Sequence, residues 1–115
     1  MKNFKKLKVW QNGMQIVFTM YKLTKLFPSE EKFGLTSQMN RAAVSIPSNI
    51  SEGSSRDSSK EHKYFLQIAL GSCFELETQV LIAEELKLGE KVILEQLKKL
   101  INEEQKMLMS FISKL

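Results

Sequence analysis

A proline lies in the middle of a segment that otherwise has the pattern of an α-helix, and this feature constrains the fold most strongly. Polar residues recur every three or four positions between Arg41 and Arg56, which places them on one helical face. A proline inside a helix removes a backbone hydrogen bond and bends the helix, at a cost of about 3 kcal/mol. We therefore expect a helix that bends near Pro47, with the bend kept for packing or for a site.

The composition favours a single all-α domain. The chain has 115 residues, enough for one hydrophobic core, so we expect one domain over residues 1–115. Only two prolines and five glycines occur, as is usual in helical proteins. No apolar run approaches the ~20 residues of a membrane span, and the basic N-terminus lacks an apolar signal core. Because the single Cys73 also suits a reducing environment, we expect a cytoplasmic protein without a membrane association.

Turn and capping residues divide the chain into four expected helices, at about residues 6–27, 36–53, 59–87 and 90–114. Pro28 ends the first helix, and Thr36 is the expected N-cap of the second. Ser58 and Glu61 have the spacing of a capping box, which predicts the start of the third. Short loops between long helices predict an antiparallel up-down four-helix bundle.

Two of the expected helices carry a second apolar stripe, although a surface helix needs only one. In residues 6–27 one stripe contains Leu7, Trp10, Met14, Val17 and Tyr21, and the other contains Val9, Ile16, Met20, Leu23 and Phe27. In residues 59–87 the second stripe contains Leu66, Leu70, Phe74 and Leu81. A second stripe is either a widened core face or a subunit contact. Because exposed apolar patches mark interaction surfaces, we expect these last four residues to form an oligomer interface.

The polar face of the proline-containing helix has two interpretations. In the first, Ser45, Asn49 and Glu52 meet Ser72 and Glu75 of the next helix in a hydrogen-bonded network that fixes the helix register. Such a network must be closed, because a buried polar group without a partner costs about 1–3 kcal/mol.

The second interpretation is a pocket for a small ligand or nucleic acid around Asn49, Glu52 and Arg56. Arg41 and Arg56 are the only arginines, and bidentate pairing with a carboxylate would explain their use in place of lysine. Glu104 interrupts the apolar face of the last helix, where it is either partly hydrated or paired with a polar group of a neighbour.

Positive charge concentrates at the start of the chain. Residues 1–28 contain six lysines and no acidic residue, whereas the whole chain has a net charge of +4. This surface is either an ordinary solvated face or a basic face that attracts phosphate backbones. The candidate nucleic-acid-binding residues are Lys5, Lys8, Lys22, Arg41 and Arg56.

Catalytic and metal-binding patterns do not occur in the sequence. His62 is the only histidine, and its place beside the capping box predicts an exposed residue at a helix start. One histidine and one cysteine give no metal-ligand cluster of the usual spacing, and no glycine-rich phosphate loop is present. We therefore expect no enzyme activity, no metal and no cofactor.

Several motifs in the same order resemble one known family. They are Leu7–Gln11, Leu23–Pro28, Phe33–Gln38, Arg41–Arg56, and Phe65–Ser72 with Glu75 and Leu76. Over about residues 4–85 the chain is similar to the bacterial four-helix-bundle proteins encoded in intervening sequences of large-subunit ribosomal RNA genes. Many relatives have a second arginine where this chain has Asn40, so the resemblance implies a weaker basic surface there.

The residues and the resemblance leave two main functional classes. The resemblance implies a homo-oligomer, a pentamer, that binds RNA or DNA, as do the similar accessory proteins of diversity-generating retroelements. The alternative is a structural adaptor for a protein partner whose identity the sequence does not give. An enzyme is the weakest class, because no nucleophile–base pair stands out.

Overall fold

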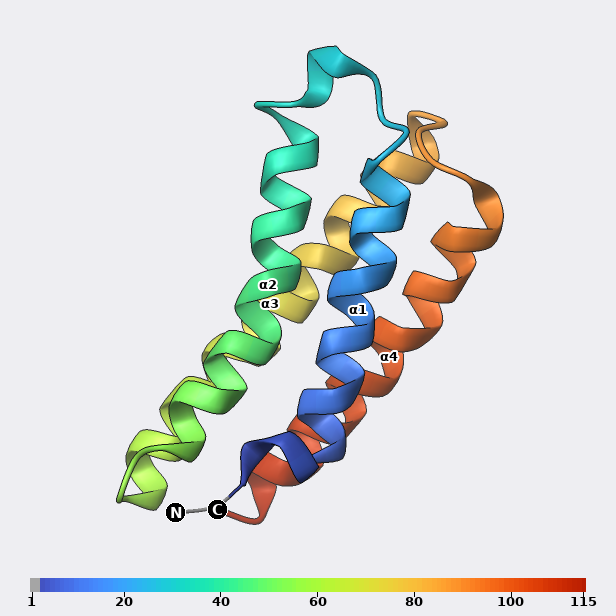
Figure 1. The fold of residues 1–115 in the computed structure, drawn as a ribbon. Helices are drawn as coiled ribbons and strands as arrows, with labels where there is room; N and C mark the ends of the chain where they lie inside the picture. Colours follow the sequence, from blue (N-terminus) through green and yellow to red (C-terminus); the bar gives the residue numbers. More distant parts are fainter. Residues whose placement is uncertain (1–2) are drawn as a thin grey trace.

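The computed structural model describes residues 3–115, in which four long helices pack as one bundle (Figure 1). They are α1 (Lys8–Thr24), α2 (Leu35–Ser54), α3 (Ser59–Glu85) and α4 (Lys91–Ser113), and the loops add the short 3-10 helices η1 (Phe4–Lys6) and η2 (Ser29–Glu31). Each helix packs against two neighbours, in the cyclic order α1, α2, α3, α4, and successive helices run in opposite directions (Figure 1). No strand occurs in residues 3–115, so the predicted all-α four-helix fold is confirmed. Lys2, which contributes to the charge of the first 28 residues, lies outside the described part.

Only one of the two apolar stripes of the first helix is fully buried in the core. The stripe that runs from Val9 to Phe27 is buried at all five positions. The other stripe is half-buried from Leu7 to Val17, and its last member, Tyr21, is 51% exposed. Most of the second stripe therefore widens the core face.

Small residues bring α2 and α3 close together. The hydroxyl groups of Ser45 and Ser72 share a hydrogen bond of 2.9 Å between the two helices. Nearer the loop, a Cβ atom at Gly53 would lie 2.9 Å from Cβ of Phe65 and 3.2 Å from the carbonyl oxygen of His62. Glycine is required at this position because the two backbones leave no space for a side chain.

The expected bend in α2 is visible as a change of direction half-way along its ribbon (Figure 1). Pro47 is buried inside this helix.

The helix α2 begins at Leu35, with Gly34 in the N-cap position, so the prediction that Thr36 is the N-cap was wrong. Gly34 offers no side chain to bond the free N–H groups of the first turn.

The capping box predicted at the start of α3 is confirmed. Ser58 Oγ accepts a hydrogen bond from the backbone N–H of Glu61 and also bonds to the Glu61 carboxylate.

Among the described residues α3 is the one helix long and apolar enough to cross a membrane. The core helix of a helical bundle meets the same criterion, and the side of α3 that contains Leu66, Leu76 and Val80 is packed inside the bundle.

The contact at Gly53 makes a testable prediction about stability. We expect Gly53→Ala to lower the free energy of unfolding by about 1–3 kcal/mol, because the new methyl group overpacks the α2–α3 contact. Gly71→Ala is the matched control, since a Cβ atom at Gly71, inside α3, would meet nothing within 4 Å. That change should be stabilising by up to about 1 kcal/mol through helix propensity. Equal effects of the two substitutions in denaturant unfolding would contradict the close contact.

Candidate functional site

A basic groove lies at the end of the bundle where the chain begins and ends. It is formed by the start of α1 and the last turns of α4, which run side by side (Figure 1). Its volume is about 400 Å³. Three lysines, one serine and four apolar residues line it: Lys8, Lys106, Lys114, Ser110, Leu7, Val9, Met107 and Phe111. The lining contains no acidic residue, so the groove has an unopposed positive charge.

The segment before α1 is folded back against α1 and α2. Asn3 caps η1 by accepting a hydrogen bond from the backbone N–H of Lys5. The ring of Phe4 packs edge-on against Trp10, with 5.4 Å between the ring centroids. Gln11 then donates a hydrogen bond of 2.9 Å to the carbonyl oxygen of Lys5. These contacts hold exposed Lys5 against the first turns of α1, next in the chain to the groove residues.

The five candidate basic residues do not form one surface. Lys5 and Lys8 lie at the groove end of α1, whereas exposed Lys22 lies 14 residues further along, about 21 Å away at the helical rise. Arg41 lies on α2 and lines a different pocket. Arg56 pairs with Glu52 at 3.5 Å and lies over the Phe65 ring, 4.9 Å from its centroid.

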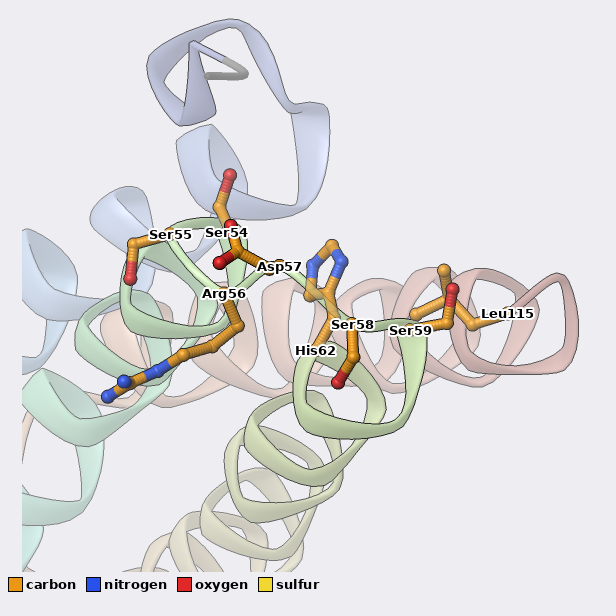
Figure 2. Close-up of a pocket in the computed structure, with 8 residues that line it drawn as sticks. All are labelled: Ser54, Ser55, Arg56, Asp57, Ser58, Ser59, His62 and Leu115. Atoms are coloured by element: carbon orange, nitrogen blue, oxygen red, sulfur yellow. The ribbon is translucent and has the colours of Figure 1, made fainter.

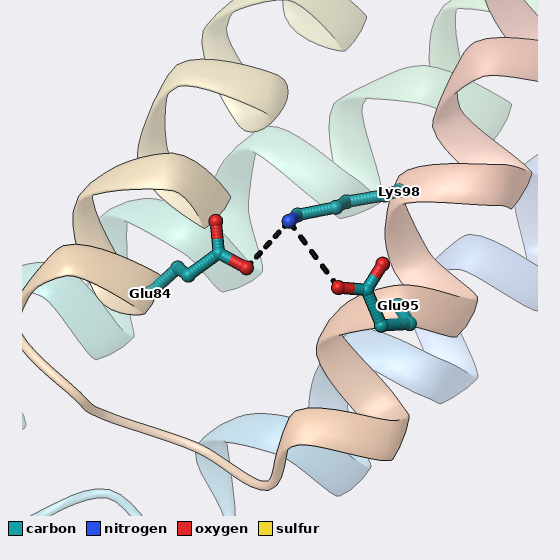
Figure 3. Close-up of polar contacts among 3 residues, drawn as sticks. All are labelled: Glu84, Glu95 and Lys98. Carbon is teal, nitrogen blue, oxygen red and sulfur yellow. Dashed lines mark hydrogen bonds and ion pairs between the residues drawn. The ribbon is translucent and has the colours of Figure 1, made fainter.

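Lys106 and Lys114 are groove residues that sequence reasoning missed. The sequence does contain a signal for a basic end of the fourth helix, because no acidic residue follows Glu104 in the chain. The predicted antiparallel topology also places the end of the fourth helix beside the start of the first. Lys98, by contrast, is neutralised: it bonds to Glu84 of α3 and to Glu95 of its own helix (Figure 3). The hydrogen bond to Glu84 contributes most to raising the pKa of Lys98.

The hydrogen-bonded network of α2 contains fewer residues than expected. Asn49 Nδ2 donates to the carbonyl oxygen and to Oγ of Ser45, and Ser45 bonds to Ser72. Glu52 and Glu75 lie outside this group, so their assignment to it was wrong. Both carboxylates are exposed, because burying a charge without a partner is costly, and Glu75 accepts a hydrogen bond from Gln79 instead.

The alternative ligand pocket around Asn49, Glu52 and Arg56 does not form as expected. Arg56 lines a pocket of about 560 Å³ at the α2–α3 loop, but Asn49 and Glu52 are not part of its lining (Figure 2). In Figure 2 the guanidinium group of Arg56 points away from Ser58 and His62. The arginine belongs to the surface of the bundle.

His62 was wrongly expected to be exposed. It is 5% exposed, and its ring packs edge-on against Phe111 of α4 at a centroid distance of 5.2 Å. The sequence pattern around the capping box gives no sign of this contact, because it depends on where the end of α4 lies. The missing side chain of Gly53 leaves the space that the histidine fills.

The expected interface stripe on α3 is partly buried. Leu66 is fully buried, so its assignment to an oligomer interface was wrong: it packs inside the bundle. Leu70 is half-buried, whereas Phe74 and Leu81 are 47% and 50% exposed. Only the outer edge of the stripe, which contains Phe74 and Leu81, is therefore exposed enough to contact another subunit.

The most unusual group is a carboxyl enclosed in the centre of the bundle. Glu104 of α4 is 0% exposed, and its Oε1 accepts a hydrogen bond of 3.0 Å from Asn12 Nδ2 of α1. The same amide group donates to the carbonyl oxygen of Leu100 at 3.1 Å. A Cβ atom at Gly13 would lie 3.0 Å from Oε2 of Glu104 and 3.5 Å from Pro47. Gly13 thus lets α1, α2 and α4 meet around the carboxyl.

Burial raises the pKa of Glu104 to about 8, and the hydrogen bond from Asn12 opposes this shift only in part. The carboxyl is therefore largely protonated at neutral pH. Burial likewise raises the pKa of the Cys73 thiol, so this cysteine stays protonated and unreactive. Among residues 3–115, no group of three or more His, Cys, Asp or Glu side chains could hold a metal ion.

Taken together, the fold and the site define a small all-α protein with a buried polar centre and a lysine-rich end. The chain belongs to the 23S rRNA-intervening sequence protein family, whose model matches residues 5–110. The resemblance noted in the sequence is thereby confirmed.

A solved structure has the same fold. It is a crystal structure of a protein with unknown function from the S23 ribosomal protein family of Bacteroides thetaiotaomicron VPI-5482. The two chains are 24% identical with a TM-score of 0.83, over 91% of this chain and 95% of the other. No curated protein matches the sequence.

The buried carboxyl predicts that stability falls as pH rises. The unfolded chain loses the Glu104 proton near its ordinary pKa of 4.5, whereas the folded chain keeps it until about pH 8. Between these values the folded state binds more protons, so its free energy of unfolding falls by up to about 1.4 kcal/mol per pH unit.

Denaturant unfolding across this pH window measures the effect. Glu104→Gln should remove most of the fall, because the amide cannot ionise and its oxygen still accepts from Asn12. Glu103→Gln, the same substitution at an exposed neighbour, should leave the fall intact. Identical pH profiles for the two variants would contradict a protonated core carboxyl.

Proposed function

We propose that this protein is a non-enzymatic, homo-oligomeric module that binds RNA or DNA through the basic groove, without sequence preference. The observation that carries the proposal is the acid-free lining, in which Lys8, Lys106 and Lys114 converge from the two ends of the chain. Lysines act as point charges that contact phosphates and carry no base information.

The first turn of α1 adds to this field. Leu7 in the N-cap position makes no side-chain cap, and no acidic residue lies in the first turn. The N–H groups of this turn have partial positive charge, and Leu7, Lys8 and Val9 line the groove. Lys5 and Lys6, both exposed in η1, add positive charge to the same end of α1.

The proposal that the protein is not an enzyme rests on the environments of its single histidine and its single cysteine. The single histidine is packed against Phe111, and the single cysteine is buried with a raised pKa. The thiol is therefore not placed to act as a nucleophile, and the histidine ring, which lines the pocket at the α2–α3 loop, is fixed by its packing against Phe111. A cytoplasmic location is part of the same proposal, because nucleic acid is found there and Cys73 is a free thiol.

The oligomer in the proposal uses the outer edge of α3. Phe74 and Leu81 are seven residues apart, so they lie on one helical face with half-buried Leu70. Exposed apolar side chains grouped in this way mark contact surfaces. The family resemblance gives five subunits, and a ring of subunits would repeat the basic groove around its axis.

Reversing the groove charges tests the nucleic-acid interface. We expect Lys8→Glu with Lys106→Glu to weaken binding to unrelated oligonucleotides alike, by about tenfold or more in low salt, and to flatten the salt dependence by roughly two charges. Fluorescence anisotropy over a salt series measures both quantities. Lys91→Glu with Lys99→Glu makes the same change of charge at exposed positions of α4 outside the groove, and should have a smaller effect.

A second candidate, an adaptor for a protein partner, is favoured by the exposed apolar edge of α3. Wild-type protein that does not bind nucleic acid in low salt, or a groove variant that binds as well as wild type, would favour this candidate and refute the groove.

A separate measurement tests the oligomer. We expect Phe74→Asp with Leu81→Asp to give the 13.3 kDa monomer in light scattering, because the charges oppose burial of this edge against another subunit. Val92→Asp, at an exposed apolar position on α4, is the control and should keep the wild-type mass. A wild-type monomer at micromolar concentration would exclude the oligomer, and an unchanged mass for the double variant would exclude this surface.

A further inference from the structure

A second pocket with a positive charge lies between the end of α1 and the start of α2. Its volume is about 650 Å³, within the range of small-molecule sites. Its lining combines two cations, four hydroxyl or amide groups and an aliphatic residue: Lys32, Arg41, Tyr21, Thr36, Ser37, Asn40 and Val44. We propose that this pocket binds a nucleoside phosphate, either free or at the end of a nucleic-acid strand.

The charges of the pocket are available to an anion. Within residues 3–115 no ion pair joins Lys32 or Arg41 to a carboxylate, and no acidic residue lines the pocket. Lys32 Nζ lies 5.5 Å from the centroid of the Phe33 ring, a contact that leaves its charge intact. Arg41 can present two parallel N–H groups to a phosphate.

The neutral donors are arranged for the same ligand. Asn40 Oδ1 lies 3.0 Å from Thr24 Oγ1, whose single hydroxyl hydrogen is shared with the carbonyl oxygen of Met20, and Asn40 lines the pocket. Thr36 Oγ1 has less than 1 Å² exposed and, among the described residues, no hydrogen-bond partner. Because this hydroxyl is enclosed, Thr36 forms part of the wall of the pocket and not a contact with the ligand. Ser37 adds a further hydroxyl to the lining.

The start of α2 adds to the attraction. Gly34 provides no side-chain cap, and the Glu31 carboxylate makes only a long bond of 3.4 Å to the backbone N–H of Leu35. The following N–H groups belong to Thr36 and Ser37, two residues that line the pocket. Phosphate groups bind readily where free N–H groups of a helix start meet cationic side chains.

The rest of the lining fits a flat ring. Tyr21 and Val44 are 51% and 40% exposed, and both face the pocket that contains the cations. An aromatic side chain offers a surface on which a nucleobase stacks, with little preference among bases. The pocket therefore pairs a phosphate-binding part with an aromatic and aliphatic part, as a nucleoside phosphate requires. The pocket shares no residue with the basic groove and is independent of the proposed function.

Titration of the wild-type protein with AMP, followed by backbone NMR signals, tests the site. We expect saturable shifts that centre on residues 36–41, weaker binding of inorganic phosphate, and no comparable binding of adenosine. Arg41→Gln and Lys32→Gln should each weaken AMP binding by about tenfold or more, because each removes a charged contact to the phosphate. Lys99→Gln, an exposed lysine on α4, is the charge-matched control and should leave the affinity unchanged.

The proposal would be overturned by AMP binding that survives both pocket substitutions, or by the absence of saturable shifts up to about 10 mM AMP. Adenosine binding as tightly as AMP would also refute it. The groove variant with Lys8→Glu and Lys106→Glu should bind AMP as wild type does, so failure of the groove and failure of the pocket are distinguishable.

A pair of oligonucleotides separates the two sources of the ligand. If the site takes a strand end, a 5′-phosphorylated oligonucleotide should bind more tightly than the same strand with a 5′-hydroxyl, and Arg41→Gln should abolish the difference. If the site takes a free nucleotide, the two strands should bind equally while AMP still shifts residues 36–41. Either result supports a nucleoside phosphate as the ligand class.

Discussion

The hydrogen bonds of Asn12 to Glu104 and to the backbone of Leu100 set the position of α1 against α4. Apolar side chains alone would tolerate small shifts along the helix axes, but a buried amide and carboxyl tolerate only the register in which they meet. Lys8 lies one turn before Asn12, and Lys106 lies two residues after Glu104. The same register therefore brings these lysines to one groove, so the polar centre of the core determines the geometry of the charged end.

The four-helix fold was accessible from the sequence because it depends on local signals. Periodic apolar residues, Pro28 and the N-cap at Ser58 each act over a few residues, and they separate the helices correctly, although α1 ends at Thr24 and not at the predicted Phe27. The buried stripe of α1 could not be distinguished from its neighbour in the same way. Which stripe faces inward depends on where α2 and α4 lie, and this is a property of the packed bundle.

The errors about individual residues share this cause. His62 is buried because Gly53 and Phe111, from two other helices, enclose it. Leu66 was grouped with exposed positions because a helical stripe has two edges, and its inner edge belongs to the core. The groove lysines of α4 come from the opposite end of the chain to Lys8, so a local count of charge along the sequence missed them. The periodicity of the sequence shows which residues share a face of one helix. Predicting a site also requires knowing which faces of different helices pack together.

The beginning and the end of the described chain lie at the same end of the bundle (Figure 1). Leu7 and Lys114 line one groove, so the segments that lead into α1 and out of α4 are neighbours in space. A short linker between these neighbouring segments could therefore give a circular permutant. New termini in the α1–α2 loop or the α3–α4 loop would open at the far end of the bundle. Such a rearranged chain would keep all four helices and leave the groove free of extensions.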